Sequence, residues 1–170
     1  MAADLPNLNF GLNVKPLHCS LHPTIVPNIL DHFLRRPTDQ KSVVGTLLGS
    51  VDGTQVDIQT CFSVPLAEDE ESGLVVDKDY LLKMLNFHRK VNSKEGLIGL
   101  YLSGQKLNEM AVYLYKYYQD LSRDKKNKAM LPSPLIMLID PTMQGNRLSI
   151  KVSYLLQYKR AIAVMNYEWR

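Results

Sequence analysis

The sequence has 170 residues, 45% of them hydrophobic, and a formal net charge of only +3, so we expect one stable globular domain and infer no class of partner from charge alone. Its two cysteines, Cys19 and Cys61, are too few for a disulfide framework, and no charged-then-apolar leader opens the chain. Because its apolar runs are far shorter than the roughly 20 residues of a membrane-spanning helix, we expect a soluble protein of the reducing cytoplasm, without membrane contact.

The chain is expected to begin with an arm, a short strand and a helix. Residues 1–13 show no hydrophobic period and are interpreted as an N-terminal arm, followed by a single domain over residues 14–170 with a strand at residues 14–19. Thr24 can cap a helix whose apolar positions, ending at Leu34, follow the 3.6-residue period. Pro37 then ends this helix.

A long hairpin is expected next. Near-continuous or alternating apolar residues predict strands at 42–51 and 55–64, and Asp52 and Gly53 between them form a typical hairpin turn. The acidic stretch 65–76 is expected to be a solvated crossover loop.

A helix over residues 78–91, capped by Asp77, carries apolar residues in two stripes. A helix that is apolar on two sides packs against two surfaces, which leaves two interpretations open: it is buried within its own domain, or one stripe binds a partner protein. The candidate partner interface consists of Tyr80, Leu81, Met84, Leu85, Phe87 and His88.

The last part of the chain alternates strands and a helix. Strands are predicted at 97–103, 135–139, 148–156 and 161–167, with a turn at 144–146 and a mobile basic loop at 121–134. A helix over residues 106–120 is expected to bury Leu107, Met110, Ala111, Leu114 and Tyr118, with Tyr113, Tyr115 and Tyr117 on its other faces. This order predicts an α/β (α+β) fold with a central mixed sheet flanked by helices.

No motif for catalysis, cofactor binding or metal binding stands out. His18, Cys19 and His22 lie close together, but no further residue completes a zinc ligand set. The chain lacks a nucleophile elbow and a phosphate-binding loop. Basic side chains near one another could contact RNA phosphates without sequence specificity, although a solvated loop is the simpler interpretation; they are Arg123, Lys125, Lys126 and Lys128.

Several segments resemble the MPN (JAMM-related) domain family: VVGTLLG at 43–49, CFSVP at 61–65, KVN at 90–92 and LIGLY at 97–101. The resemblance covers about residues 15–170 and implies an MPN-type fold. Within the family, the f subunits of eukaryotic translation initiation factor 3 fit best, with QGNRLSIK at 144–151 as further support. The non-catalytic MPN subunit of the proteasome lid fits nearly as well.

Active members of this family are zinc isopeptidases, and the resemblance places their site on four positions of this chain. The two zinc-binding histidines correspond to Leu102 and Gly104, the aspartate ligand to Tyr115, and the glutamate that activates water to Ser42. None of these residues can take over its role. The resemblance therefore implies a protein that binds no zinc, has no catalytic residues and is not an enzyme.

The resemblance also implies a scaffold function. The expected partners are a second MPN subunit, subunit h of the same factor, the other subunits of that factor, and the small ribosomal subunit, on which the factor supports assembly of the preinitiation complex. The alternative is a scaffold subunit of the proteasome lid or the signalosome. Because f subunits continue into further helices whereas this chain ends at Arg170, contacts made by such helices are not assumed.

Overall fold

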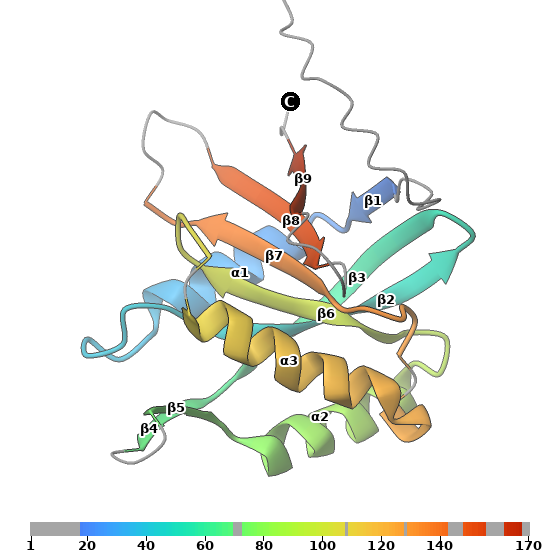
Figure 1. Ribbon diagram of the computed structural model, residues 1–170, viewed down its shortest axis with the longest axis horizontal. Helices are drawn as coiled ribbons and strands as arrows, with labels where there is room; N and C mark the ends of the chain where they lie inside the picture. Colours follow the sequence, from blue (N-terminus) through green and yellow to red (C-terminus); the bar gives the residue numbers. More distant parts are fainter. Residues whose placement is uncertain are drawn as a thin grey trace, which may run out of the picture.

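The computed structural model describes residues 18–69, 73–107, 109–127, 129–142, 148–155 and 162–167. Its centre is a twisted sheet of seven strands in the order β1-β3-β2-β6-β7-β8-β9 (Figure 1). The pairs β1/β3 and β6/β7 are parallel and the other neighbours are antiparallel. The strands are β1 (His18–Leu21), β2 (Val44–Asp52), β3 (Gln55–Val64), β6 (Gly96–Ser103), β7 (Leu135–Asp140), β8 (Ser149–Leu155) and β9 (Ile162–Tyr167).

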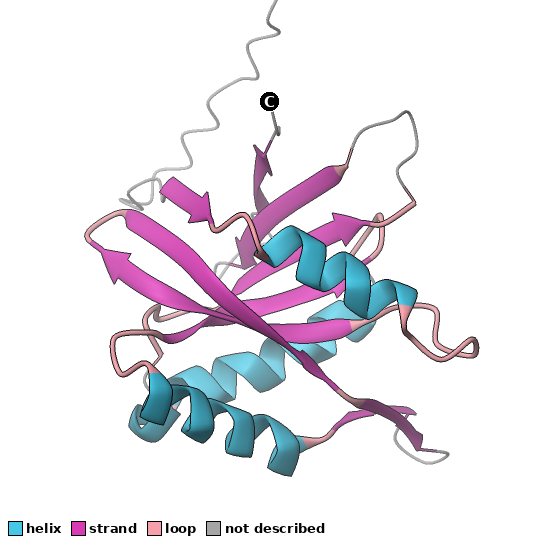
Figure 2. Cartoon of the chain, turned by 180° about the vertical axis from the view of Figure 1, so that it is seen from behind, coloured by secondary structure: helices cyan, strands magenta, loops and turns pink. Residues whose placement is uncertain are grey.

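Helices cover both faces of this sheet, which confirms the predicted fold class. Helix α1 (Ile25–Leu34) lies on one face, whereas α2 (Lys78–Val91) and α3 (Glu109–Arg123) lie side by side on the other (Figures 1 and 2). Every residue of β6 is buried, as expected for a central strand covered on both faces. No helix in the described part of the chain is long and apolar enough to span a membrane.

The core therefore has two layers. The layer on the α1 side includes Ile29, Ile58 and Tyr101, and the layer on the α2 and α3 side includes Leu81 and Leu114. The Tyr101 ring lies across Gly45 on β2, where a Cβ atom would come within 2.2 Å of the ring. Glycine at position 45 is thus required by the close approach of this ring.

Several predicted elements are confirmed. Strands β2 and β3 form the expected hairpin, and Gly53 at its turn has a φ of 59°. Helix α2 has the predicted bounds, and the Asp77 carboxylate accepts a hydrogen bond from the Tyr80 amide at 2.9 Å. Helix α1 ends before Pro37 as predicted, but Thr24 makes no capping hydrogen bond; its hydroxyl lies 2.8 Å from Nδ1 of His22 instead.

Residues 65–76 do not form the predicted loop. Strands β4 (Leu66–Asp69) and β5 (Gly73–Val76) pair as a separate antiparallel ribbon, with Leu66 opposite Val76. The sequence did not reveal this pairing because the segment is acidic and contains a glycine, a composition typical of loops. Val76 ends the ribbon as a buried residue in the core beside α2.

Two further predictions near the chain's C-terminal half are wrong. Helix α3 is displaced by three residues from the predicted range 106–120, and Tyr115 is buried rather than on another face. It lies four residues after Ala111 and three before Tyr118, so it belongs to the buried stripe.

The segment 121–134 is held against the sheet instead of forming a free loop. It contains the last turn of α3 and the short 3₁₀ helix η1 (Lys125–Asn127). The Met130 amide then donates to the Leu97 carbonyl at 2.9 Å, and Leu131 is buried in the core. The arm at 1–13, residues 14–17 and the turn at 144–146 lie outside the described residues.

Candidate functional site

The fold brings together the elements that carry the four positions singled out by the family resemblance. Leu102 and Gly104 lie at the end of β6, Ser42 lies just before β2, and Tyr115 lies on α3. Val44 of β2 pairs with Leu102, and the Ser103 hydroxyl accepts a hydrogen bond from the Val43 amide at 2.8 Å. The start of β2 is therefore fixed beside the end of β6.

Apolar packing occupies this region. Leu102 is 2% exposed and Tyr115 is 5% exposed, and both belong to the core cluster on the α2 and α3 side of the sheet. The same cluster contains Val44 and Leu138. An aliphatic side chain offers no lone pair to a metal, so the Leu102 position contributes packing and no ligand.

Gly104 differs from a ligand position in its backbone as well. Its φ of +154° is one that L side chains rarely adopt, and its amide donates a hydrogen bond to the Ile139 carbonyl at 2.7 Å. A histidine at this position would therefore need a local change of backbone conformation. Space is not the obstacle, because the nearest atom to a Cβ here is Cδ1 of Leu138 at 4.0 Å.

Candidate metal ligands elsewhere are not brought into a ligand set. Within the described residues, no group of three or more His, Cys, Asp or Glu side chains could hold a metal ion. His22 lies beside Thr24 through its Nδ1 atom, and burial raises the pKa of the Cys19 thiol. A raised pKa disfavours the thiolate that would bind a metal.

A buried pair of hydroxyl groups ties α3 to β2 beneath this region. The Tyr118 and Thr46 hydroxyl oxygens are 2.6 Å apart, and both residues are completely buried. Burial raises the pKa of Tyr118, so the phenol stays protonated. Sequence reasoning placed Tyr118 in the core but could not identify its partner, which is 72 residues away in the chain.

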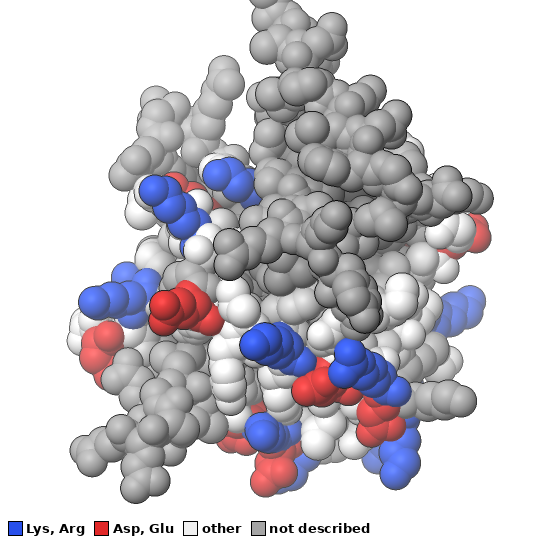
Figure 3. Space-filling model, in the orientation of Figure 1, with Lys and Arg blue, Asp and Glu red and all other residues white. Residues whose placement is uncertain are grey.

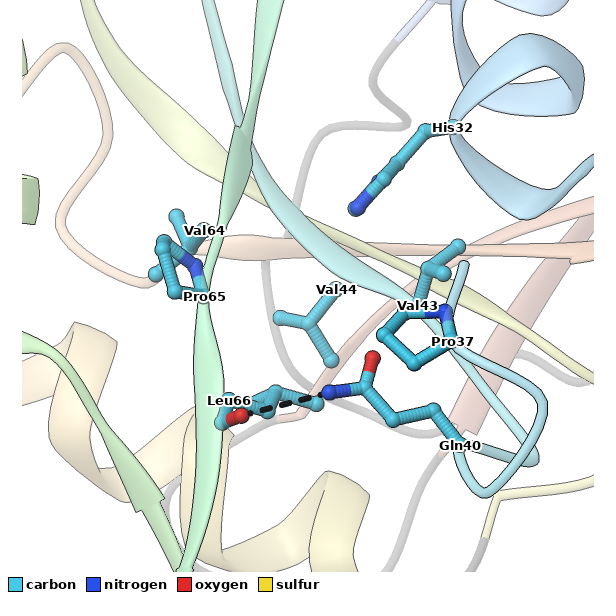
Figure 4. A pocket seen from close by; sticks show the side chains of 8 residues that line it. All are labelled: His32, Pro37, Gln40, Val43, Val44, Val64, Pro65 and Leu66. Atoms are coloured by element: carbon cyan, nitrogen blue, oxygen red, sulfur yellow. Dashed lines mark hydrogen bonds between the residues drawn. The ribbon is translucent and has the colours of Figure 1, made fainter. Parts of the chain in front are cut away.

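Two hollows lie near the start of β2. The first has a volume of about 220 Å³, and its walls come from α1, the following loop, β2, the end of β3 and the start of β4 (Figure 4). It is lined by His32, Pro37, Gln40, Val43, Val44, Val64, Pro65 and Leu66. The second, of about 350 Å³, is lined by Asn28, Asp31, His32, Arg35, Cys61, Phe62, Ser63 and Tyr101.

His32 lines both hollows. Its Nδ1 atom is 2.9 Å from the Tyr101 hydroxyl, which links α1 to β6. Burial lowers the pKa of His32, an effect that the nearby Asp31 partly offsets. Sequence reasoning assigned this histidine no site, because a single histidine on a helix gives no signal of the strand residues that face it.

The candidate partner interface on α2 is divided between core and surface. Leu81 and Leu85 are buried, whereas Phe87 is 57% exposed and Val91, on the same stripe, is 87% exposed. The remaining candidates, Tyr80, Met84 and His88, are half-buried. His88 is held by the buried Glu95, at 2.6 Å between Nε2 and Oε2.

The structure therefore favours one stripe of α2 as core and the end of the other as exposed surface. On the neighbouring α3, Val112 and Tyr113 are also exposed. That the candidate residues of α2 bind a partner stays a prediction.

Of the four basic residues near the end of α3, the structure describes the side chains of Arg123 and Lys126. Arg123 is exposed and paired with Asp120 at 3.2 Å, and Lys126 is exposed. The side chain of Lys125 and the whole of Lys128 lie outside the described part of the structure. On the face seen in Figure 3, basic and acidic side chains are interspersed. RNA contact through this segment stays a prediction.

Comparison with known proteins adds a family and a set of relatives. A family model described as JAB1/Mov34/MPN/PAD-1 ubiquitin protease matches residues 14–124. The chain is 38% identical over 135 residues to the F subunit of eukaryotic translation initiation factor 3 of Phaeosphaeria nodorum, which covers 78% of this chain and 38% of that protein.

Two other proteins of the same name are similar. The protein of Coccidioides immitis is 43% identical over 108 residues, or 62% of this chain and 31% of that protein. The protein of Dictyostelium discoideum is 39% identical over 100 residues, or 59% of this chain and 34% of that protein. The chain thus spans about a third of the length of the relatives that it matches.

Proposed function

Because the chain belongs to the JAB1/Mov34/MPN/PAD-1 family, we propose that it is a non-catalytic MPN scaffold subunit of eukaryotic translation initiation factor 3. In this role it pairs with a second MPN subunit, subunit h of the factor, in the cytoplasm. The assembled factor supports formation of the preinitiation complex on the small ribosomal subunit. The names of the relatives support the assembly, since each is an F subunit of translation initiation factor 3.

The observation that carries the non-catalytic assignment is the packing at the end of β6. Isopeptidase chemistry of this family needs a zinc ion and an acid/base group that activates its water. Leu102 and Tyr115 are instead buried in one apolar cluster, Gly104 has no side chain, and Ser42 has no carboxylate. Loss of one ligand could be compensated by another group, but loss of all four roles leaves no site for the metal.

Zinc content and cleavage activity test this assignment directly. We expect the purified protein to contain far less than one equivalent of zinc by elemental analysis and to leave a diubiquitin substrate intact. Stoichiometric zinc together with cleavage that stops on chelation would overturn the non-catalytic assignment. An active isopeptidase of the same family, assayed in parallel, serves as the positive control.

Pairing with a second MPN subunit is proposed to use the exposed end of the α2 stripe. Phe87→Asp places a charge on this stripe, whereas Asn86→Asp introduces the same charge at an adjacent exposed position, about 100° around the helix. We expect Phe87→Asp to reduce co-purification with co-expressed subunit h at least about tenfold, the effect of burying an unpaired charge. Asn86→Asp is expected to leave it unchanged. Equal recovery of both variants would remove α2 from the interface.

Affinity purification from the native cell identifies the multisubunit complex that contains this protein. Recovery of the other initiation factor subunits with small ribosomal subunit proteins is the expected result. Recovery of proteasome lid or signalosome subunits instead would replace the initiation factor assignment while leaving the non-catalytic one intact.

A further inference from the structure

The second half of β3 presents an open strand edge. On one side β3 pairs with β2 along its whole length, but on the other side β1 pairs only with Gln55–Ile58. Among the described residues, no strand pairs with that side from Gln59 to Val64. Because main-chain groups point alternately to the two sides of a strand, about half of the N–H and C=O groups in this segment face away from β2. Such an edge is a template for a further strand.

A groove lies between α1 and the second half of β3, and Tyr101 of β6 also lines it. The helix contributes Asn28, Asp31, His32 and Arg35, whose spacing of three and four residues places them on one face. Across the hollow of about 350 Å³ lie Cys61, Phe62 and Ser63 of β3. These strand residues are only half-buried, in contrast to the facing part of β2, which is buried throughout.

The smaller of the two hollows lies past the end of β3. His32 lines both hollows, and beyond it the walls are mainly apolar, with Val43 and Val44 on one side and Val64 and Leu66 on the other (Figure 4). This hollow of about 220 Å³ has room for one aliphatic or aromatic side chain.

The charges along the groove define its occupant further. Asp31 and Arg35 are the charged residues that line the two hollows, and they form an ion pair with each other at 2.9 Å. The groove therefore offers no net charge to a phosphate backbone or to an acidic segment. It offers main-chain hydrogen-bonding groups, polar side chains and one apolar hollow, which together complement an uncharged extended peptide.

From this geometry we propose that the groove between α1 and β3 binds an extended segment of a partner protein. The segment adds as a strand to the open edge of β3 and places one apolar side chain in the hollow lined by Val64 and Leu66. The lining of this hollow reaches both core layers, because Val43 belongs to the cluster on the α1 side whereas Val44 and Val64 belong to the cluster that contains α2.

The test uses seven-residue peptides in which threonine alternates with valine, leucine or phenylalanine, blocked at both ends. Backbone NMR spectra of the protein, titrated with each peptide, are expected to show the largest shifts at Gln59–Val64 and at His32. Absence of saturable shifts at these residues with all three peptides would overturn the proposal.

N-methylated peptides separate strand addition from simple side-chain binding. One series carries N-methyl groups on the amides of one edge of the peptide, and a second series carries them on the opposite edge. Strand addition predicts that one series loses affinity at least about tenfold, because its hydrogen bonds to β3 are blocked, while the other stays within about twofold. Equal affinities or equal losses for the two series contradict strand addition.

A pair of protein variants provides the complementary test. Ser63→Trp fills the groove, whereas Ser63→Ala leaves it open and keeps the main-chain groups. We expect Ser63→Trp to abolish binding and Ser63→Ala to bind within about twofold of the unmodified protein. Both variants are first checked for an unchanged unfolding midpoint, and the N-methylated peptides decide the question if Ser63→Trp does not fold. Unchanged peptide binding by a folded Ser63→Trp variant would overturn the proposal.

Discussion

At the scale of single residues, the buried hydroxyl pair between Tyr118 and Thr46 is expected to contribute measurably to stability. Tyr118→Phe removes one hydroxyl and leaves the other buried without its partner, which is expected to lower the free energy of unfolding by about 1–3 kcal/mol. The double variant Tyr118→Phe/Thr46→Val removes both groups and is expected to lose less than the sum of the single losses. Urea unfolding measures the free energy of unfolding of the unmodified protein, the two single variants and the double variant.

The exposed Tyr113 supplies the control for this prediction. Tyr113→Phe is expected to change the free energy of unfolding by less than about 0.5 kcal/mol. Additive losses in the double variant would show that the two hydroxyl groups do not stabilise each other.

The residues of the candidate site differ in how far the sequence revealed them. Leu102 and Gly104 were identified by alignment with a family pattern, and their packing and backbone conformation needed the structure. Tyr115 was assigned to the wrong face because three tyrosines at alternate positions suggested a distribution around the helix. The link between His32 and Tyr101 joins residues 69 apart in the chain, so no local pattern could indicate it.

At the scale of elements, the two helices that follow a potential cap residue differ in a testable way. Asp77 accepts a hydrogen bond from the Tyr80 amide, whereas Thr24 makes no side-chain hydrogen bond to a backbone amide of α1. Asp77→Ala is therefore expected to lower the free energy of unfolding by about 1 kcal/mol, and Thr24→Ala by clearly less. Chemical denaturation of the two variants makes the comparison. A loss for Thr24→Ala equal to that for Asp77→Ala would contradict the geometry.

The accuracy of the predicted elements followed the number of local signals. Helix α2 was predicted with its correct bounds because its cap residue and its apolar period agree. The β4/β5 ribbon was missed because its stability comes from cross-strand pairing between residues such as Leu66 and Val76. Composition alone favoured a loop there, and pairing across a turn overrode it.

At the scale of the whole molecule, the sequence predicted one mixed sheet between helices but not its strand order. The strands of the two parallel pairs, β1/β3 and β6/β7, are not connected by hairpins. The extent of their pairing determines which strand edges stay open. Among the described residues, β1 pairs with only Gln55–Ile58 of β3, which no periodicity reveals. The surfaces available to partners thus depend on the strand order. Most of the buried residues, in contrast, could be predicted without knowing that order.

Alkaline pH is expected to destabilise the whole domain. Burial raises the pKa of Cys61 from 9.0 to about 11, with a partly offsetting hydrogen bond from Asn28, and burial also raises the pKa values of Tyr101 and Tyr118. Thiols and phenols are neutral when protonated, so the folded state holds these protons more tightly than the unfolded chain does. The resulting stability is complete below pH 9, is lost for Cys61 between pH 9 and about 11, and is lost for the tyrosines from pH 10 upward.

Urea unfolding midpoints measured from pH 8 to pH 11 should therefore fall as the pH rises. Cys61→Ala removes the titrating thiol, and its midpoint should fall less steeply between pH 9 and pH 11 than that of the unmodified protein. The comparison uses slopes, because the substitution also removes buried side-chain atoms and lowers stability at every pH. Parallel slopes for the two proteins would show that the Cys61 thiol titrates at the same pH in the folded and unfolded states.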